Sequence, residues 1–348
     1  MTPAAERLRA ADAHCMRLLR HYENFTVASR LTPARLRRDL ARVYAFCRTT
    51  DDLGDETGDA ALATEKLRQW RAAVEAMFAG APVDDPVLIA LSVTVRRHAL
   101  PAEPFLGLID ANLQDQRVSA YEDWPALLGY CRLSAAPVGR MVLGLFGVHD
   151  ARAEALSDDV CIGLQLANFA QDVSVDGARG RTYLLQEEIR AHGDVGATRA
   201  MCERARGLLA SGRELETMVR GRLRVQLSLY RLGGEAILDA VAAQGFDTRQ
   251  RRPALSGRAR VGIMARALAT LSKRRDAGSG RGVRPFAASS RSGETERDNA
   301  AGLFEREVER GGVFEQANGR TPRPRPLAAR RVPRPTTHVE RSEGVTHG

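Results

Sequence analysis

The sequence predicts an all-α protein. Apolar residues recur at helical spacing through roughly the first 270 positions, and no stretch alternates apolar and polar residues as a half-buried strand does. Prolines and N-cap residues stand where several of these periodic segments begin, as expected at helix starts. No G-x-G-x-x-G turn of a dinucleotide-binding βαβ unit is present. We therefore expect roughly ten helices in one domain.

The expected helices follow one another closely. After a first helix over 5–20, Thr32 and Pro33 can begin a helix that runs to Asp55. Pro125 begins another helix, which Pro137 should kink. The expected helices are 5–20, 33–55, 61–79, 86–99, 104–117, 125 onward, 151–176, 197–220, 222–244 and 254–272. The domain should thus cover residues 1–272.

Residues 273–348 differ in composition from the rest. Gly, Ser, Arg and Pro dominate, and apolar residues are too sparse to offset the entropy of ordering, so we expect a disordered tail. From Arg274 onward there are 15 Arg against 10 Asp plus Glu, so 5 of the net +9 charges lie there. The folded part is only mildly basic, and no nucleic-acid partner is expected.

The sequence also indicates a compartment. No apolar run reaches the roughly 18–20 residues that span a bilayer, and the N-terminus has no signal-peptide core. The five cysteines show no paired spacing and should be small core residues in a reducing environment. We therefore expect a cytoplasmic protein.

The segment 165–183 carries the densest polar pattern. Gln165, Asn168, Asp172 and Asp176 are spaced by three, four and four residues, which places them on one face of an α-helix. Apolar neighbours fill the other faces, so this helix should be largely buried. Two carboxylates four residues apart repel each other, more strongly when buried, and a cation is expected beside them.

A similar pair occurs upstream. Asp51 and Asp55 follow an apolar run, with Arg48 and Tyr44 on the same helical face. Two such helices facing each other would form a carboxylate-lined hole. Oxygen ligands suit Mg²⁺, which prefers to share its shell with phosphate oxygens, and Arg48 would add a guanidinium fork. The two motifs together predict a diphosphate site.

These motifs resemble those of the squalene/phytoene synthase family. The first is Asp51-x-x-x-Asp55 after Tyr-Ala-Phe-Cys-Arg, and the second is the 165–176 pattern before Gly-Arg181-x-Tyr183. The resemblance covers about residues 14–270. Within the family, several segments look like the bacterial hydroxysqualene synthase branch of the hopanoid pathway, namely residues 21–25, 130–140, 180–187 and 245–256.

The resemblance implies a fold and a reaction. The fold is the class I isoprenoid (terpenoid) synthase bundle of helices around a central cavity. Presqualene diphosphate would lose diphosphate to Mg²⁺ (several ions bridged by the diphosphate), rearrange and capture water to give hydroxysqualene, with no NADPH. A presqualene diphosphate synthase would supply the substrate. The apolar product favours peripheral contact with the inner face of the membrane.

The same resemblance assigns roles to residues. The implied metal ligands are Asp51, Asp55, Asn168, Asp172 and Asp176. The implied substrate-binding residues are His21, Arg48, Gln165, Arg181 and Tyr183. Tyr130 should line the cavity near the reacting carbons, and it forms the implied catalytic set with Arg48, Asp51 and Asp172.

The chain departs from the family pattern at several positions. Glu23 and Asn24 stand where other branches place basic or hydroxyl residues, which fits an enzyme that handles one diphosphate instead of two. Ala170 and Gly177 are smaller than expected and would loosen the cavity mouth, and Leu185 replaces an expected proline.

Simpler roles compete with these assignments. Arg48 could be a structural partner of Asp52, and Tyr130 could serve packing alone. For Arg251 and Arg252 we expect a role in capping a helix in preference to closing over the diphosphate.

Two other functions compete with the hydroxysqualene synthase hypothesis. A head-to-head condensing prenyltransferase, making presqualene diphosphate, squalene or phytoene, would need two diphosphate subsites, and Glu23 argues modestly against them. A non-catalytic lipid-binding or assembly protein of the same fold should lose acidic ligands, and all four aspartates are present.

Overall fold

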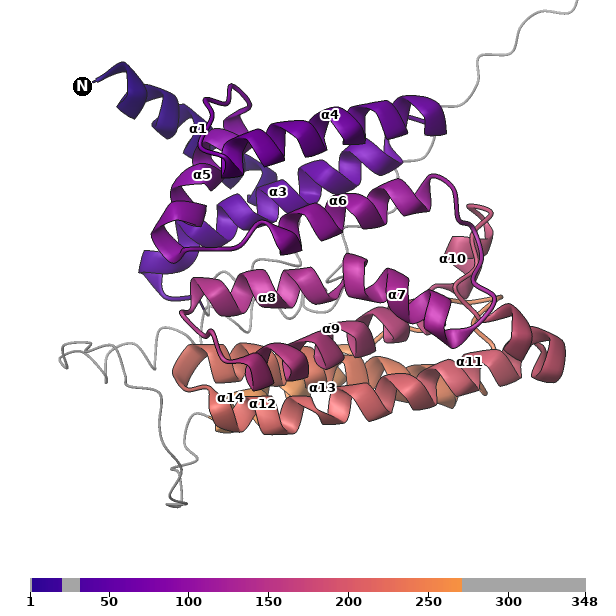
Figure 1. Ribbon diagram of the computed structural model, residues 1–348. Helices are drawn as coiled ribbons and strands as arrows, with labels where there is room; N and C mark the ends of the chain where they lie inside the picture. The colour runs from indigo at the N-terminus through magenta and orange to yellow at the C-terminus, as the bar shows by residue number, and fades with distance from the viewer. Residues whose placement is uncertain (1, 21–31, 271–348) are drawn as a thin grey trace, which may run out of the picture.

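The computed structural model describes residues 2–20 and 32–270, which form helices and no strand (Figure 1). The all-α prediction is therefore confirmed. In chain order the elements are α1 (Pro3–Arg20), the 3-10 turn η2 (Ala34–Leu36), α3 (Arg37–Asp55), α4 (Ala60–Phe78), α5 (Pro86–His98), α6 (Glu103–Asp115), α7 (Trp124–Ser134), α8 (Ala136–Leu145), α9 (Ala151–Gln171), α10 (Val173–Gly177), α11 (Gln186–Ala210), α12 (Gly212–Met218), α13 (Gly221–Ala243) and α14 (Gly257–Ala269). His21, Glu23, Asn24 and the expected tail lie outside the described residues.

The buried apolar residues form two clusters. In Figure 1, α3 to α6 lie in one part of the bundle, and α9 and α11 to α14 in the other. The first surrounds Phe46 and Phe105 and joins α1, α3, α4, α5, α6 and α8 with parts of α9, α12 and α13. The second surrounds Leu166 and Leu238 and joins α7, α9, α11, α13 and α14. Helix α9 belongs to both, because Leu156 near its start packs in the first cluster. This helix therefore carries the second polar motif through the middle of the molecule.

Side-chain caps fix where many of the helices begin. The capping residues accept hydrogen bonds from backbone N–H groups of the first helical turn, and such a cap contributes about 1 kcal/mol. They are Asp59, Asp85, Asp123, Asp150 and Ser256, which begin α4, α5, α7, α9 and α14. Prolines in the first turn of α5 to α8 reinforce these starts, since that position needs no N–H donor.

Three expected helices have different bounds in the structure. The helix expected over 151–176 is two helices, separated at Asp172, whose backbone is not helical (φ −101°, ψ 16°). The helix from Pro125 is divided at Ala135, just before Pro137, where the expected kink becomes a break. The helix expected to begin at 197 begins at Gln186 and bends at Gly193, whose φ of 66° suits glycine.

A fully buried carboxylate fixes the start of α3. Asp39 accepts hydrogen bonds from Thr94 Oγ1 (2.8 Å) and Arg42 Nη1 (3.1 Å). Arg97 Nη1 and His98 Nε2 each lie 3.1 Å from its second oxygen. Burial acts to raise the pKa of Asp39, but the hydrogen bonds and the two arginine charges outweigh it, and the pKa is lowered.

The same network reaches α1. Arg42 also binds both carboxylate oxygens of Asp12, at 2.8 and 3.0 Å. Helices α1, α3 and α5 are thus connected through two carboxylates that share one arginine. Because α3 ends with Asp51 and Asp55, this network also sets the position of the first acidic motif.

The chain's two tryptophans lie in different halves of the bundle. Trp70 of α4 is buried, stacks on Phe46 and donates from Nε1 to Thr50 Oγ1 at 2.9 Å. Trp124, at the start of α7, packs against the second apolar cluster with the guanidinium of Arg204 above its ring. Trp70 therefore attaches α4 to α3 directly beside Asp51.

Replacing Asp39 by Asn should destabilise the protein by about 3 kcal/mol, because it removes the charged acceptor of four side chains and one of the two carboxylates that pair with buried Arg42. Urea unfolding at pH 7, followed by far-UV circular dichroism, measures this. Asp84→Asn is the matched control, since Asp84 is fully exposed in its pair with Arg7 and its loss should not change stability.

The difference between wild type and Asp39→Asn should also depend on pH. A carboxyl group with a lowered pKa stabilises the fold above its unfolded pKa, about 4, and loses this contribution as pH falls through the folded value. The gap should therefore shrink below about pH 4. A gap that stays constant down to pH 3 would show that Asp39 is not ionised in the fold.

Candidate active site

The first acidic motif lies on the last two turns of α3. Asp51 accepts a hydrogen bond from Asn112 Nδ2 at 3.3 Å, which places it against α6. Asp55 is exposed at the helix end. Gly54 lies between them, and a Cβ there would come within 2.8 Å of Asn112 Oδ1. The close approach of α6 to the acidic end of α3 therefore requires this glycine.

Arg48 is buried and forms ion pairs with Asp52 and with Glu56, the latter at 3.4 Å. Burial raises the pKa of Asp52 to about 6, although the charge of Arg48 acts in the opposite direction. The structural pairing considered for Arg48 is thus present. The diphosphate role of Arg48 stays a prediction.

The second motif is largely buried. Gln165 is 2% exposed, Asp172 8% and Asp176 3%, while Asn168 is half-buried. The Gln165 side-chain oxygen has no hydrogen-bond partner, and an unpaired buried polar atom costs about 1–3 kcal/mol. The break at Asp172 gives α10, which carries Asp176, its own direction. These four residues therefore follow one continuous segment but not one straight helix face.

Asp172 is paired with an arginine that the motif did not suggest. Arg252, in the connection between α13 and α14, forms an ion pair with the Asp172 carboxylate through Nε, and its Nη2 lies 3.5 Å from the other oxygen. The helix-capping role expected for Arg252 is wrong, because Ser256 caps α14 and the guanidinium faces the acidic motif.

Arg181 connects the two motifs. Its backbone N–H donates to the carbonyl of Asp176 at 3.0 Å, so the chain turns back tightly after α10. Its guanidinium lies 3.7 Å from Asp55 and donates to the carbonyl of Asp115 at the end of α6 (3.2 Å). The segment that follows the second motif thus reaches the first motif.

Four aromatic rings pack together behind these polar groups. Tyr183 stacks face to face on Phe169, with ring centroids 3.8 Å apart, and both rings contact Tyr130. Tyr121 completes the group. The Tyr130 hydroxyl donates to Asp115 Oδ2 at 2.8 Å. Tyr183 is buried in this group, and its predicted diphosphate role is not tested by the contacts.

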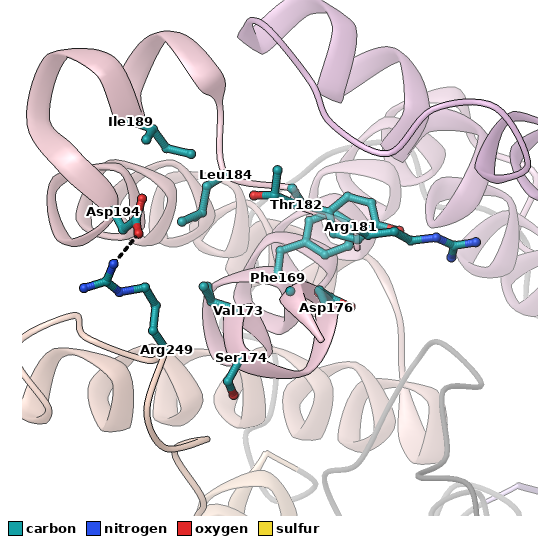
Figure 2. Close-up of a pocket in the computed structure, with 12 residues that line it drawn as sticks. Phe169, Val173, Ser174, Asp176, Arg181, Thr182, Leu184, Ile189, Asp194 and Arg249 are labelled. Atoms are coloured by element: carbon teal, nitrogen blue, oxygen red, sulfur yellow. Dashed lines mark hydrogen bonds and ion pairs between the residues drawn. The ribbon is translucent and has the colours of Figure 1, made fainter. Parts of the chain in front are cut away.

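A cavity of about 330 Å³ lies beside α10 (Figure 2). Phe169, Val173, Leu184 and Ile189 form its apolar walls, and Asp176 and Arg181 reach it from the acidic side. The ion pair of Asp194 and Arg249 (2.7 Å) lies across the cavity from Arg181, whose guanidinium points away from it. Gly177 lines this cavity, whereas Ala170 is fully buried and does not, so the looser cavity mouth expected from these two residues stays a prediction.

Two stripes of partly exposed residues run through otherwise buried helices. Tyr44 and Cys47 precede the acids of α3, and Cys161 and Leu164 precede those of α9. Burial nevertheless raises the pKa of Cys47 well above its usual value and that of Cys161 to about 12.

Sequence reasoning missed Asn112 and Asp115, and for Arg252 it favoured helix capping over a role at the site. Asp115 carried a local signal, since a carboxylate at the C-terminal end of a helix is disfavoured by the helix dipole unless it has a use. Asn112 and Arg252 carried none, because only the packing of α6 and of the α13–α14 connection brings them to the site.

The donor atoms fit a magnesium–diphosphate complex. Asp51, Asp55, Asn168, Asp172 and Asp176 all offer side-chain oxygen atoms to an incoming ion. Mg²⁺ is commonly held by one or two carboxylates together with substrate phosphates. Within the described ranges, no three His, Cys, Asp or Glu side chains are gathered closely enough to hold an ion alone.

In the same ranges, no helix combines the length and the apolar character needed to traverse a bilayer.

Comparison with solved structures supports the fold. The squalene synthase HpnC of Alicyclobacillus acidocaldarius is 43% identical with a TM-score of 0.65, covering 69% of this chain and 95% of that one. A dehydrosqualene synthase solved with a ligand is 23% identical with a TM-score of 0.68, covering 77% of this chain and 99% of that one, which shows the shared fold. The isoprenoid-synthase bundle implied by the motifs is therefore confirmed.

Sequence comparison gives the family. The chain is 31% identical over 270 residues to phytoene synthase 3 of Zea mays, covering 70% of this chain but only 62% of that protein's length. It is 31% identical over 277 residues to the hydroxysqualene synthase of Rhodopseudomonas palustris, covering 74% of this chain and 87% of the relative. The family model described as squalene/phytoene synthase matches residues 18–259, and the chain belongs to this family.

Proposed function

We propose that this protein is a magnesium-dependent hydroxysqualene synthase. The substrate would be presqualene diphosphate, and the products hydroxysqualene and inorganic diphosphate. Atoms balance if water adds its hydroxyl to the rearranged carbocation and gives its second proton to solvent or to the released diphosphate. No reductant is consumed, because water and not hydride ends the reaction.

One observation carries the proposal. Arg181 follows Asp176 of the second motif and lies 3.7 Å from Asp55 of the first, so both acidic motifs border one polar site. A diphosphate between two acidic elements needs cations on several sides, and arginine supplies planar paired donors for its oxygens. The hydroxysqualene synthase of Rhodopseudomonas palustris, matched over most of its length, supports the choice of reaction within the family.

Different residues of the site would bind the metal, bind the diphosphate and orient a hydrogen-bond donor during ionisation of the substrate. Asp51, Asp55, Asn168, Asp172 and Asp176 would hold Mg²⁺, which when bound neutralises charge on the departing diphosphate. Arg181 would contact the diphosphate between the two motifs, and Arg48 and His21 are proposed to support it. Gln165, with its buried unpaired oxygen, would orient an ion-bound or substrate-bound hydrogen donor.

The aromatic group would protect the carbocation. Tyr130, Phe169 and Tyr183 present π-electron density in a dry setting, and cation–π attraction is worth about 2 kcal/mol or more when desolvated. The Tyr130 hydroxyl is held by Asp115, which keeps its oxygen away from the reacting carbons. An apolar wall also limits the number of waters that can reach the cation.

A condensing activity is the main alternative, supported by the phytoene synthase relatives at the same identity. It would join two prenyl diphosphates, releasing one diphosphate to give presqualene diphosphate, or two to give phytoene or, with a reductant, squalene. We further propose that the protein works in the cytoplasm at the inner membrane face and receives its substrate from a presqualene diphosphate synthase.

A product assay tests the proposal. Purified protein with Mg²⁺ and presqualene diphosphate, without NADPH, should give hydroxysqualene in extracts examined by mass spectrometry, and farnesyl diphosphate should remain unused. Consumption of farnesyl diphosphate would replace the proposal by the condensing alternative. A folded sample that converts neither substrate would favour the non-catalytic lipid-binding or assembly protein.

Substituting a proposed metal ligand should remove most of the activity. Asp176→Asn keeps the size of a buried side chain but removes one ligand charge, and we expect kcat to fall by about 10²–10³-fold, as for other lost electrostatic contacts in active sites. Asp239→Asn is the control, since Asp239 is exposed on α13 and pairs with Arg206. Equal activity of both variants would contradict the role of Asp176.

A further inference from the structure

The connection between α13 and α14 is fastened to the end of α9 at two points. Thr248 Oγ1 donates to the carbonyl of Ala170 at 2.7 Å. Gln171 Nε2 donates to the carbonyl of Pro253, also at 2.7 Å. Both bonds are buried, so the backbone on either side of Arg252 is held against the acidic motif. Arg252 lies between these two attachment points, and its side chain reaches the Asp172 carboxylate.

Arg252 is placed to neutralise Asp172. Its guanidinium meets the carboxylate through two nitrogens, and Nη2 also lies 3.4 Å from the Gln171 side-chain oxygen. The Asp172 side chain is 12% exposed and that of Arg252 28%. The pair is therefore shielded from water more than an ordinary surface pair, and its geometry is the paired one that arginine forms with carboxylates.

This contact conflicts with metal binding at the same carboxylate. An oxygen that accepts from a guanidinium has less charge to offer a cation, and a divalent ion close to Asp172 would repel the arginine. Gly177 and Ser174 on α10 carry no charge that could compensate. The Asp172 carboxylate can thus pair strongly with Arg252 or bind an ion strongly, but it cannot do both at once.

We propose that Arg252 and the metal compete for Asp172, so that the metal binds well only together with diphosphate. The inference rests on the proposed function, since it assigns a positioning residue to that same site. The arginine holds the Asp172 carboxylate in place when no ligand is bound. When diphosphate binds, its negative charge can stabilise the Arg252 guanidinium in place of Asp172, so the arginine can leave the carboxylate.

Competition between Arg252 and the metal would couple the binding of the metal to the binding of diphosphate. A metal alone must displace Arg252 and gains little, whereas metal and diphosphate together compensate for the displaced arginine. The affinity for the metal should therefore rise with diphosphate by more than the direct contact between the two ligands provides. Removing the Arg252 charge should abolish this extra coupling.

The test measures Mn²⁺ binding by electron paramagnetic resonance, with and without inorganic diphosphate, on full-length protein without substrate. Arg252→Gln should bind Mn²⁺ alone at least about fivefold more tightly than wild type. With diphosphate its affinity should be unchanged or weaker, so the ratio of the two affinities falls. Arg251→Gln is the matched control, because Arg251 is the exposed neighbour and should behave as wild type.

The direction of the change separates competition from a structural role. If Arg252 only fastened the connection, its loss would weaken Mn²⁺ binding in both conditions, and this result would overturn the inference. Equal behaviour of Arg252→Gln and Arg251→Gln would also overturn it. Arg252→Lys, which keeps the charge but not the paired geometry, should shift binding the same way by a smaller factor and serves if the Gln variant does not fold.

The proposed function and this inference fail in different ways. Wild-type protein that binds neither Mn²⁺ nor diphosphate, separately or together, would contradict the metal site itself and the inference with it. Wild-type protein that binds them together, with variants that show an unchanged affinity ratio, would contradict the role of Arg252 alone.

Discussion

The pairing of carboxylates, most of them buried, with arginines from other segments is the constraint on which this bundle depends. Asp39 needs Arg42 and Arg97, Asp55 faces Arg181, and Asp172 faces Arg252. Each pair joins parts of the chain that the apolar clusters alone would leave free to slide, because hydrophobic contact is non-directional. Burying a carboxylate without a partner is unfavourable enough that these contacts also fix the register of the helices.

The same constraint allows a strongly acidic site to exist in a stable fold. Aspartates gathered for a metal repel one another whenever the metal is absent, and a small protein has only about 5–15 kcal/mol of stability to lose. Arg181 and Arg252 approach the acids from connecting segments, where a side chain can change position without disturbing a helix. Helices α3 and α9, held by their cores, keep the carboxylates in place.

Much of this site could be predicted from sequence because its spacing is local. Helical periodicity alone placed Asp51 with Asp55, and Gln165 with Asn168, on common faces. The break at Asp172 could not be foreseen, since no Gly or Pro lies between 165 and 176 and the break follows from contacts with the α13–α14 connection. Asn112 and Arg252 reach the site only through tertiary packing, which no local pattern records.

The placement of the two tryptophans gives each half of the bundle its own optical probe. Trp70 belongs to the first apolar cluster, and its indole N–H donates to Thr50. Trp124 packs against the second apolar cluster, with the guanidinium of Arg204 over its ring. Their emission should differ in wavelength because one indole is buried and the other partly hydrated. With no further tryptophan in the sequence, fluorescence can follow the opening of the two halves separately, without any added label.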